Sequence, residues 1–200
     1  MTSTLTRVLT RSGTVAVLAA GLALTSTAAG AATRYDTDRT DDVSVIQPSA
    51  DTAVPAPGQV NGDVLRSRMW HSSTRVGVKV VFKDLARTGA LRADVLQLVT
   101  NEGVKRDLTV FAEQGSWGGQ AELDRPNGDR VRCSVAHHTD YAANVVTISV
   151  PRSCLSNPRW VRMGYGAITS PDGSSMYVDD ALRDGDVAPD NLTLSGRIYR

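Results

Sequence analysis

The sequence predicts an all-β protein, an antiparallel β-sandwich of the jelly-roll or immunoglobulin-like type with one disulfide. Three observations lead to this prediction. Short runs with a two-residue hydrophobic period recur between residues 63 and 165, turn residues separate these runs, and helical periodicity is scarce. A series of about seven or eight short strands with turns between them is typical of a sandwich or a barrel.

The first two predicted strands form a hairpin. Residues 65–70 and 76–82 both alternate between apolar and polar or small side chains, and the turn-like residues 71–74 separate them. Further strands are predicted at residues 94–100, 107–111, 121–123, 130–135, 145–150 and 160–165. Turns are marked by residues 101–103, by the glycine-rich residues 115–119 and by Asn127-Gly128, the strongest hairpin signal. Pro151 ends its strand because proline cannot donate to a β-ladder, and residues 86–95 suit one turn or a short helix.

The N-terminus has the three parts of a secretory signal peptide in order. Residues 1–12 carry Arg7 and Arg11 and no acid, residues 13–24 are a short apolar run, and small residues follow with the cleavage pattern Ala29-Gly30-Ala31. A membrane anchor is disfavoured, because the run has about 12 residues and a transmembrane helix needs about 20. We therefore expect residues 1–32 to be removed on export, after which no membrane span remains.

Composition divides the rest of the chain into three parts. Residues 33–61 have few large apolar side chains, so we expect a flexible leader in which only residues 43–46 suit a strand. Residues 62–166 form the predicted sandwich domain. Residues 167–200 are rich in Asp and Gly, which is typical of a solvated tail, with residues 192–199 as a candidate edge strand.

Net charge gives no indication of a particular partner. The chain has 22 basic and 21 acidic residues, a net charge of +1, and loss of residues 1–32 removes two arginines and no acid, leaving it close to −1. Nucleic-acid binding is not expected of a near-neutral exported protein, because it depends on an excess of basic side chains.

The two cysteines, Cys133 and Cys154, indicate a disulfide, as an even number does in an exported protein. Closing a loop of about 20 residues would stabilise the fold by about 3 kcal/mol. The alternatives have less support, because zinc would need two further ligands and a redox pair is usually Cys-x-x-Cys.

The fragments Val-Pro-Arg-Ser-Cys-Leu (residues 150–155) and Pro-Arg-Trp-Val-Arg (residues 158–162) resemble the signature of a group of small secreted proteins of high-GC Gram-positive bacteria. The alternating Arg and Val residues before Lys83-Asp84-Leu85 fit the same group, and the likeness covers roughly residues 63–165. This resemblance implies a β fold and the Cys133–Cys154 bridge. It implies no activity and no catalytic residues.

The outward positions of several predicted strands are basic. If the apolar parity of each strand faces the core, the opposite parity faces solvent. The outward side chains are then Arg66, Arg68, Trp70, Lys79, Lys83, Arg130, Arg132, Trp160 and Arg162. Merged in one sheet, they would form a basic face with tryptophan platforms that suits an anionic polymer, such as wall teichoic acid or an acidic polysaccharide. The competing interpretation is that these positions are simply solvated, with the arginines neutralised by Asp-rich loops.

Nucleophilic catalysis has little support in the sequence. Ser153 lies beside the predicted disulfide and no Gly-x-Ser-x-Gly motif is present. The sequence has three histidines, His71, His137 and His138. The best candidate for a general base is His138, with Asp140 to orient its ring, but residues only two positions apart can instead form hydrogen bonds within a turn. The adjacent His137 and His138 would point to opposite faces of a strand, so they do not form a metal site together.

Acidic residues leave two further alternatives. Calcium suits Asp-rich loops of extracellular domains, and the candidates are Asp172, Asp179, Asp180, Asp184, Asp186 and Asp190. Their spacing matches no EF-hand loop, so we favour a solvated acidic tail and assign no metal and no cofactor. No carboxylate pair for glycoside hydrolysis stands out among Glu102, Glu113, Glu122 and the scattered aspartates.

These observations predict a secreted, non-catalytic β-sandwich whose basic and aromatic face binds a cell-wall polymer or an extracellular protein. Two alternatives from other classes stay open. One is a small extracellular hydrolase, and the other is a structural or inhibitory envelope protein that acts by protein–protein contact.

Overall fold

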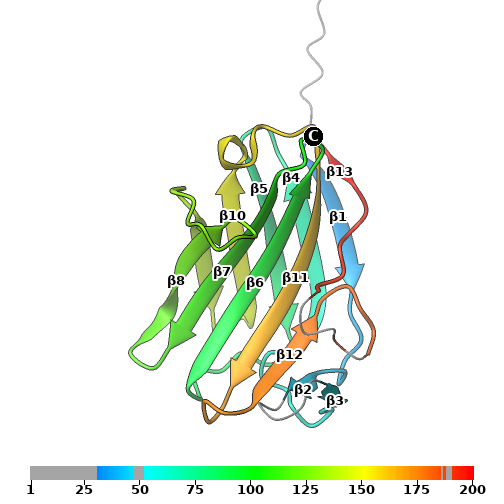
Figure 1. Ribbon diagram of the computed structural model, residues 1–200. Coiled ribbons are helices and arrows are strands. Elements are labelled where there is room, and N and C mark those ends of the chain that lie inside the picture. Colours follow the sequence, from blue (N-terminus) through cyan, green and yellow to red (C-terminus); the bar gives the residue numbers. More distant parts are fainter. Residues whose placement is uncertain (1–30, 47–51, 186, 188–190) are drawn as a thin grey trace, which may run out of the picture.

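Two antiparallel β-sheets pack against each other in the computed structural model, which describes residues 31–46, 52–185, 187 and 191–200 (Figure 1). The predicted antiparallel sandwich with one disulfide is confirmed. Within the described residues the only helical element is a 3₁₀ turn, η1 (Arg152–Leu155), and no helix has the length and hydrophobicity to cross a membrane. The predicted signal peptide falls on residues 1–30, outside the described residues, apart from its last two positions.

The first sheet has five strands. In spatial order they are β1 (Ala32–Thr37), β4 (Val64–His71), β5 (Arg75–Phe82), β10 (Val145–Pro151) and β9 (Ala136–Asp140). The predicted hairpin is β4–β5, and the strand predicted at residues 145–150 is β10, which lies between β5 and β9.

The second sheet has eight strands. Seven follow the order β3 (Ala53–Pro55), β2 (Ser44–Ile46), β12 (Met176–Asp180), β11 (Trp160–Ser170), β6 (Leu91–Thr100), β7 (Lys105–Glu113) and β8 (Ser116–Asp124), and β13 (Ile198–Tyr199) pairs with β11. The long strands β6, β7 and β11 form its centre (Figure 1).

The core lies between the sheets and follows the predicted parity. Val76, Val78, Val80 and Phe82 of β5 are all buried, opposite Val161, Met163 and Tyr165 of β11 and the leucines of β6 and β7. Alternation therefore predicts the inward side of these strands correctly, because each strand turns every second side chain into the same layer.

Several boundaries differ from the prediction. Residues 130–135 form no strand, because only the Asp124–Arg130 bridge follows the Asn127-Gly128 turn, and β9 begins at Ala136 instead. No helix forms at residues 86–95, where β6 starts at Leu91. The predicted strand at residues 160–165 continues to Ser170, because β6 supplies backbone partners along all of it.

The predicted flexible leader is wrong for its first part. β1 pairs with β4 over six residues, from Ala32 opposite His71 to Thr37 opposite Arg66. Thr33, Tyr35 and Thr37 favour strands through their side chains, and the backbone hydrogen bonds to β4 do not require a large apolar face. The segment at residues 43–46, expected to suit a strand, forms β2.

The predicted solvated tail is also wrong in large part. β12 pairs with β11 and β2, and the C-terminal residues continue along β11, where Ser195 N donates to Met163 O at 2.8 Å. Gly164 and Gly166 of β11 allow this approach, because a Cβ at Gly166 would lie 2.7 Å from a methyl carbon of Leu192. The edge strand expected at residues 192–199 is reduced to β13.

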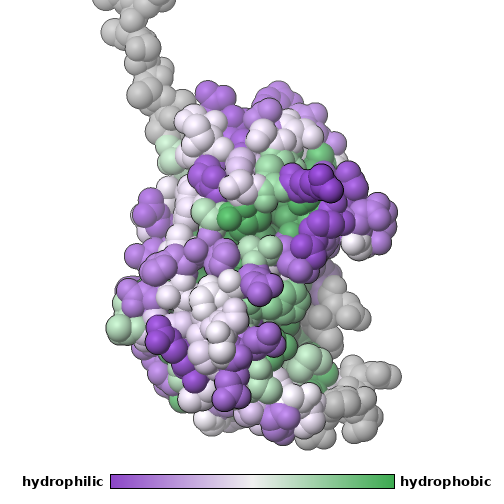
Figure 2. All heavy atoms as spheres, turned by 90° about the vertical axis from the view of Figure 1, so that its left-hand side faces the viewer, coloured by the Kyte–Doolittle hydropathy of each residue, from purple (hydrophilic) through white to green (hydrophobic). Residues whose placement is uncertain are grey.

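The side of the sandwich at β8 and β9 is bridged by a disulfide and by side-chain hydrogen bonds. The Cys133–Cys154 disulfide is formed and packs on the core. At the same side, the backbone carbonyls of β8 accept hydrogen bonds from the His137 ring (3.1 Å, to Gly119 O) and from Tyr141 Oη (2.8 Å, to Trp117 O). Figure 2, which views the molecule from the side where β8 lies, shows a hydrophobic band between hydrophilic flanks, as expected where the edges of two sheets meet.

Candidate functional site

Four of the predicted ligand-binding residues lie together on the outer face of the five-stranded sheet. Arg66, Arg68 and Trp70 alternate along β4, and Lys79 is opposite Arg68 on β5. The same pairing places Tyr35 of β1 on the other side of Arg68. Tyr35, Arg68 and Lys79 therefore form one row across three adjacent strands. We call this row, together with Arg66 and Trp70, the basic face.

The aromatic rings of the basic face are positioned by their neighbours. The Arg68 guanidinium lies 5.8 Å from the Tyr35 ring centroid and 6.0 Å from that of Trp70. The Trp70 indole lies over Gly77 of β5, where a Cβ would come within 2.4 Å of the ring. Gly77 is thus required for close approach, and Trp70 is half-buried while Tyr35 is 70% exposed.

A shallow cavity of about 420 Å³ lies on this face. Its lining residues are Tyr35, Asp36, Thr37, Arg66, Ser67, Arg68, Lys79 and Val81. Asp36 is the one acid among them, and its carboxylate accepts hydrogen bonds from the Arg34 guanidinium at 2.6–2.9 Å. The positive charges of Arg66, Arg68 and Lys79 are therefore not offset within the cavity.

The other five predicted residues are not part of this face. Lys83 follows β5 and pairs with Asp41 at 2.5 Å, and Arg130 pairs with Glu122 and Asp124 near the end of β8. Arg132 is exposed between β8 and β9, at the sandwich side away from β1. Trp160 and Arg162 lie on β11 in the other sheet, where Arg197 stacks on the indole and Ser195 O accepts from Arg162 Nε.

The expectation of a single merged face is thus corrected. Parity predicts which side chains leave the core, but it cannot say which sheet a strand joins. Tyr35 was missed because it belongs to the segment taken as a flexible leader. The Thr33, Tyr35, Thr37 alternation in the sequence is the signal that could have revealed it.

His71, His137 and Asp140 have structural partners, whereas His138 is exposed on β9. Buried His71 donates from Nδ1 to Ile198 O at 3.1 Å and accepts at Nε2 from Arg152 Nε at 3.0 Å. Burial, followed by the charges of Arg152 and Arg200, lowers the pKa of His71. Asp140 accepts hydrogen bonds from Ala142 N and Ala143 N, so it caps a turn and does not orient His138.

A buried polar group lies in the core near the β8–β9 side. Arg92 and Asp94 share the inward parity of β6 with leucines, and their side chains form an ion pair at 2.8 Å while 2% and 0% exposed. Tyr165 Oη donates to Asp94 at 2.5 Å, and Arg92 Nη2 donates to Thr139 Oγ1 at 2.9 Å. Burial raises the pKa of Asp94, and Arg92 counteracts this rise. The ion pair offsets the two charges, although Nε and Nη1 of Arg92 have no hydrogen-bond partner among the described residues, and the buried group forms no open site.

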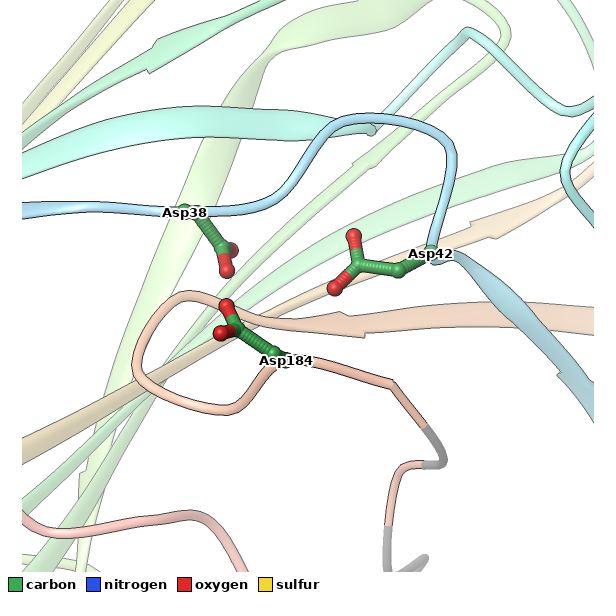
Figure 3. Close-up of side chains that lie close together, drawn as sticks. All are labelled: Asp38, Asp42 and Asp184. Atoms are coloured by element: carbon green, nitrogen blue, oxygen red, sulfur yellow. The ribbon is translucent and has the colours of Figure 1, made fainter.

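Acidic residues from distant parts of the chain meet at the end of the sandwich near β2 and β12. Asp38 and Asp42 lie between β1 and β2, Asp63 precedes β4, and Asp179 and Asp184 belong to β12 and the turn after it. Figure 3 shows the carboxylates of Asp38, Asp42 and Asp184 pointing toward one another. We call these five residues the acidic cluster.

Four of the six aspartates considered for calcium are among the described residues, and two of these four join the cluster. Asp179 and Asp184 belong to it, whereas Asp180 accepts hydrogen bonds from Leu182 N and Thr193 N, and Asp172 caps the turn at residues 174–175. Asp186 and Asp190 lie outside the described residues. The expected solvated acidic tail is wrong for Asp179, which is 1% exposed.

Burial and mutual repulsion act on the carboxyl groups of the acidic cluster. Burial, and then the charges of Asp179 and Asp42, raise the pKa of Asp38 to about 9. Burial is also the main cause that raises the pKa of Asp179 to about 7, and it raises the pKa values of Asp42 and Asp63. The cluster therefore favours either protons or a bound positive charge at neutral pH.

Comparison with known proteins adds no identity. No family model, curated protein or solved structure matches the chain. The basic face and the acidic cluster are therefore the features from which a function can be inferred.

Proposed function

We propose that the protein is an exported, non-catalytic sandwich that binds an anionic polymer of the cell envelope through the basic face. The observation that carries this proposal is the row of Tyr35, Arg68 and Lys79 across three hydrogen-bonded strands, with Arg66 and Trp70 beside it. The cavity has three positively charged side chains, and its one acid, Asp36, is already paired with Arg34. The net positive charge that remains attracts a polyanion.

The aromatic side chains favour a polymer of sugar rings over a simple anion. Tyr35 exposes 70% of its surface, and Trp70 is held against Gly77, so both rings offer flat apolar surface beside the cations. Cation–π contacts at exposed sites contribute about 0.5–1 kcal/mol each. A chain of charged sugars would engage charges and rings together along the open face, whereas a small anion would engage the charges alone.

Export is supported by two independent features. Residues 1–32 have the composition of a signal peptide, and the Cys133–Cys154 disulfide suits an oxidising compartment. The hydrolase alternative has less support, because Asp140 is used in a turn and His71 is buried against Arg152.

Co-sedimentation with purified cell-wall sacculi, at increasing salt, tests the proposal. The protein should bind saturably at low salt, and binding should weaken as screening increases. The triple variant R66Q/R68Q/K79Q should lose about tenfold or more in affinity, because each exposed charge contact contributes up to about 1 kcal/mol. Tyr35→Ala should weaken binding and leave its salt dependence nearly unchanged.

A matched control separates the basic face from net charge. The variant R125Q/R132Q/K105Q removes the same number of positive charges at exposed positions elsewhere and should bind as the wild type does. Equal loss in both triple variants would indicate non-specific attraction and contradict the proposal. Absence of binding at low salt would also contradict it, and a stoichiometric protein captured from the native envelope would favour the protein–protein alternative.

A further inference from the structure

The acidic cluster has the geometry of a cation site. Two groups of three carboxylates, Asp38–Asp42–Asp184 and Asp42–Asp63–Asp179, each bring ligand oxygens within 4.8 Å of one another. Asp42 belongs to both groups. Asp42, Asp63 and Asp179, the inner group, are all buried, whereas Asp184 of the outer group is exposed at the rim.

Each carboxylate of the inner group is anchored by one oxygen and leaves the other without a partner. Oδ2 of Asp42 accepts from Gly185 N at 3.0 Å, Oδ2 of Asp63 from Asp41 N at 3.0 Å, and Oδ2 of Asp179 from Val64 N at 2.6 Å. The Oδ1 atoms of all three residues are buried, and no group in the described part of the chain forms a hydrogen bond with them. These residues are 8%, 0% and 1% exposed, so water does not satisfy these atoms from the surface.

A buried carboxylate oxygen without a partner is costly, and the inner group has three of them within one cluster. Lys83 Nζ lies 3.7 Å from the anchored Oδ2 atom of Asp63 and so does not pair with its free oxygen. Lys83 is also engaged with Asp41 at 2.5 Å. The positions of the backbone donors therefore explain how the carboxylates are held, but not what their remaining oxygens bind.

We propose that the acidic cluster is a Ca²⁺ site in which Asp42 is the shared ligand. Both groups offer only carboxylate oxygens, the ligands that hard cations prefer, whereas zinc and copper sites usually include His or Cys. Ca²⁺ accepts six to eight oxygens in flexible geometry, whereas Mg²⁺ requires a near-ideal octahedron and retains several waters. A buried inner group with irregularly placed carboxylates suits the larger ion. This proposal is separate from polymer binding, because no residue of the acidic cluster belongs to the basic face.

Calorimetric titration and thermal unfolding of the chelator-treated protein test the proposal, with Ca²⁺ raised to about 10 mM, above the dissociation constants of extracellular calcium modules. Ca²⁺ should bind with measurable heat and raise Tm by about 5–10 °C, and Mg²⁺ should have a much smaller effect. Asp42→Asn should abolish the Ca²⁺-dependent rise. Without Ca²⁺ the same variant should be at least as stable as the wild type, because it removes one of the repelling charges.

Two further variants keep the test decisive. Asp129→Asn changes an exposed acid in the turn after β8 and should respond to Ca²⁺ as the wild type does. If Asp42→Asn does not fold, Asp184→Asn at the exposed rim should fold and weaken Ca²⁺ affinity about tenfold through loss of one charged ligand. A folded, metal-free wild type that shows neither heat nor a change in Tm would overturn the proposal, as would unchanged affinity in the Asp→Asn variants of the cluster.

Discussion

Replacing Arg92 with methionine should destabilise the protein strongly, because it leaves Asp94 buried without its cation. The Arg92 and Asp94 side chains are 2% and 0% exposed and 2.8 Å apart. Removing one member of a buried ion pair costs about 3–5 kcal/mol. Only Tyr165 Oη would still donate to the Asp94 carboxylate.

The loss of folding stability in Arg92→Met should be larger at neutral pH than in acid. Burial already raises the pKa of Asp94, and without Arg92 the folded protein would hold a proton on Asp94 more tightly than the unfolded chain does. A group with a raised folded pKa contributes stability below its unfolded value of 3.8 and loses it as pH rises. Arg92→Met should therefore be milder in acid than at neutral pH.

Urea unfolding of the single and combined variants checks this reasoning. Replacing all three polar groups, as R92M/D94L/Y165F, should cost less than R92M alone, because no unpaired charge is then left in the core and only the part-buried Thr139 hydroxyl loses a partner. Single variants that each lose less than about 1 kcal/mol, or a triple variant as unstable as the sum of the singles, would refute the assigned coupling.

Three other predictions concern separate features. Replacing Cys133 and Cys154 with alanine should lower the free energy of unfolding by about 3 kcal/mol, since 21 positions separate the cysteines, and a loss below about 1 kcal/mol in urea unfolding would contradict this. Gly77→Ala should cost about 1–3 kcal/mol and shift Trp70 fluorescence to the red, because its Cβ would lie 2.4 Å from the indole; an unchanged spectrum and Tm would argue against this packing. The His71 ring should titrate below 6.5 by NMR, so its contribution to stability is complete above that pH and declines below it; a midpoint at or above 6.5 would be inconsistent with its burial against Arg152.

The sequence predicts the central strands well because their side chains alone determine them. Val76, Val78, Val80 and Phe82 alternate so regularly that only one face of β5 suits a core. β12 could not be found in this way, and the only sequence signal for β1 is the alternation of Thr33, Tyr35 and Thr37. Their positions depend on backbone pairing with β4 and β11, which the composition of a polar segment does not reveal.

For the candidate sites too, the side-chain pattern does not reveal which segments become neighbours in the fold. Parity places Arg68 and Trp160 outward correctly, but only the strand order shows that β4 and β11 belong to different sheets. The acidic cluster could not be predicted from spacing, because Asp42 and Asp179 meet only after the chain has crossed between the sheets. Buried aspartates also look like solvated ones in a sequence, since the backbone donors that anchor them, such as Val64 N, carry no side-chain signal.

The distance along the chain between the members of the acidic cluster has a kinetic consequence. The contact between Gly185 N and the Asp42 carboxylate joins residues 143 positions apart, so it forms only when both ends of the chain have docked. Interactions that form after the folding transition state slow unfolding and leave the folding rate nearly unchanged. An ion held there would therefore lengthen the lifetime of each folded molecule. A long folded lifetime protects a protein from proteolysis and from irreversible unfolding.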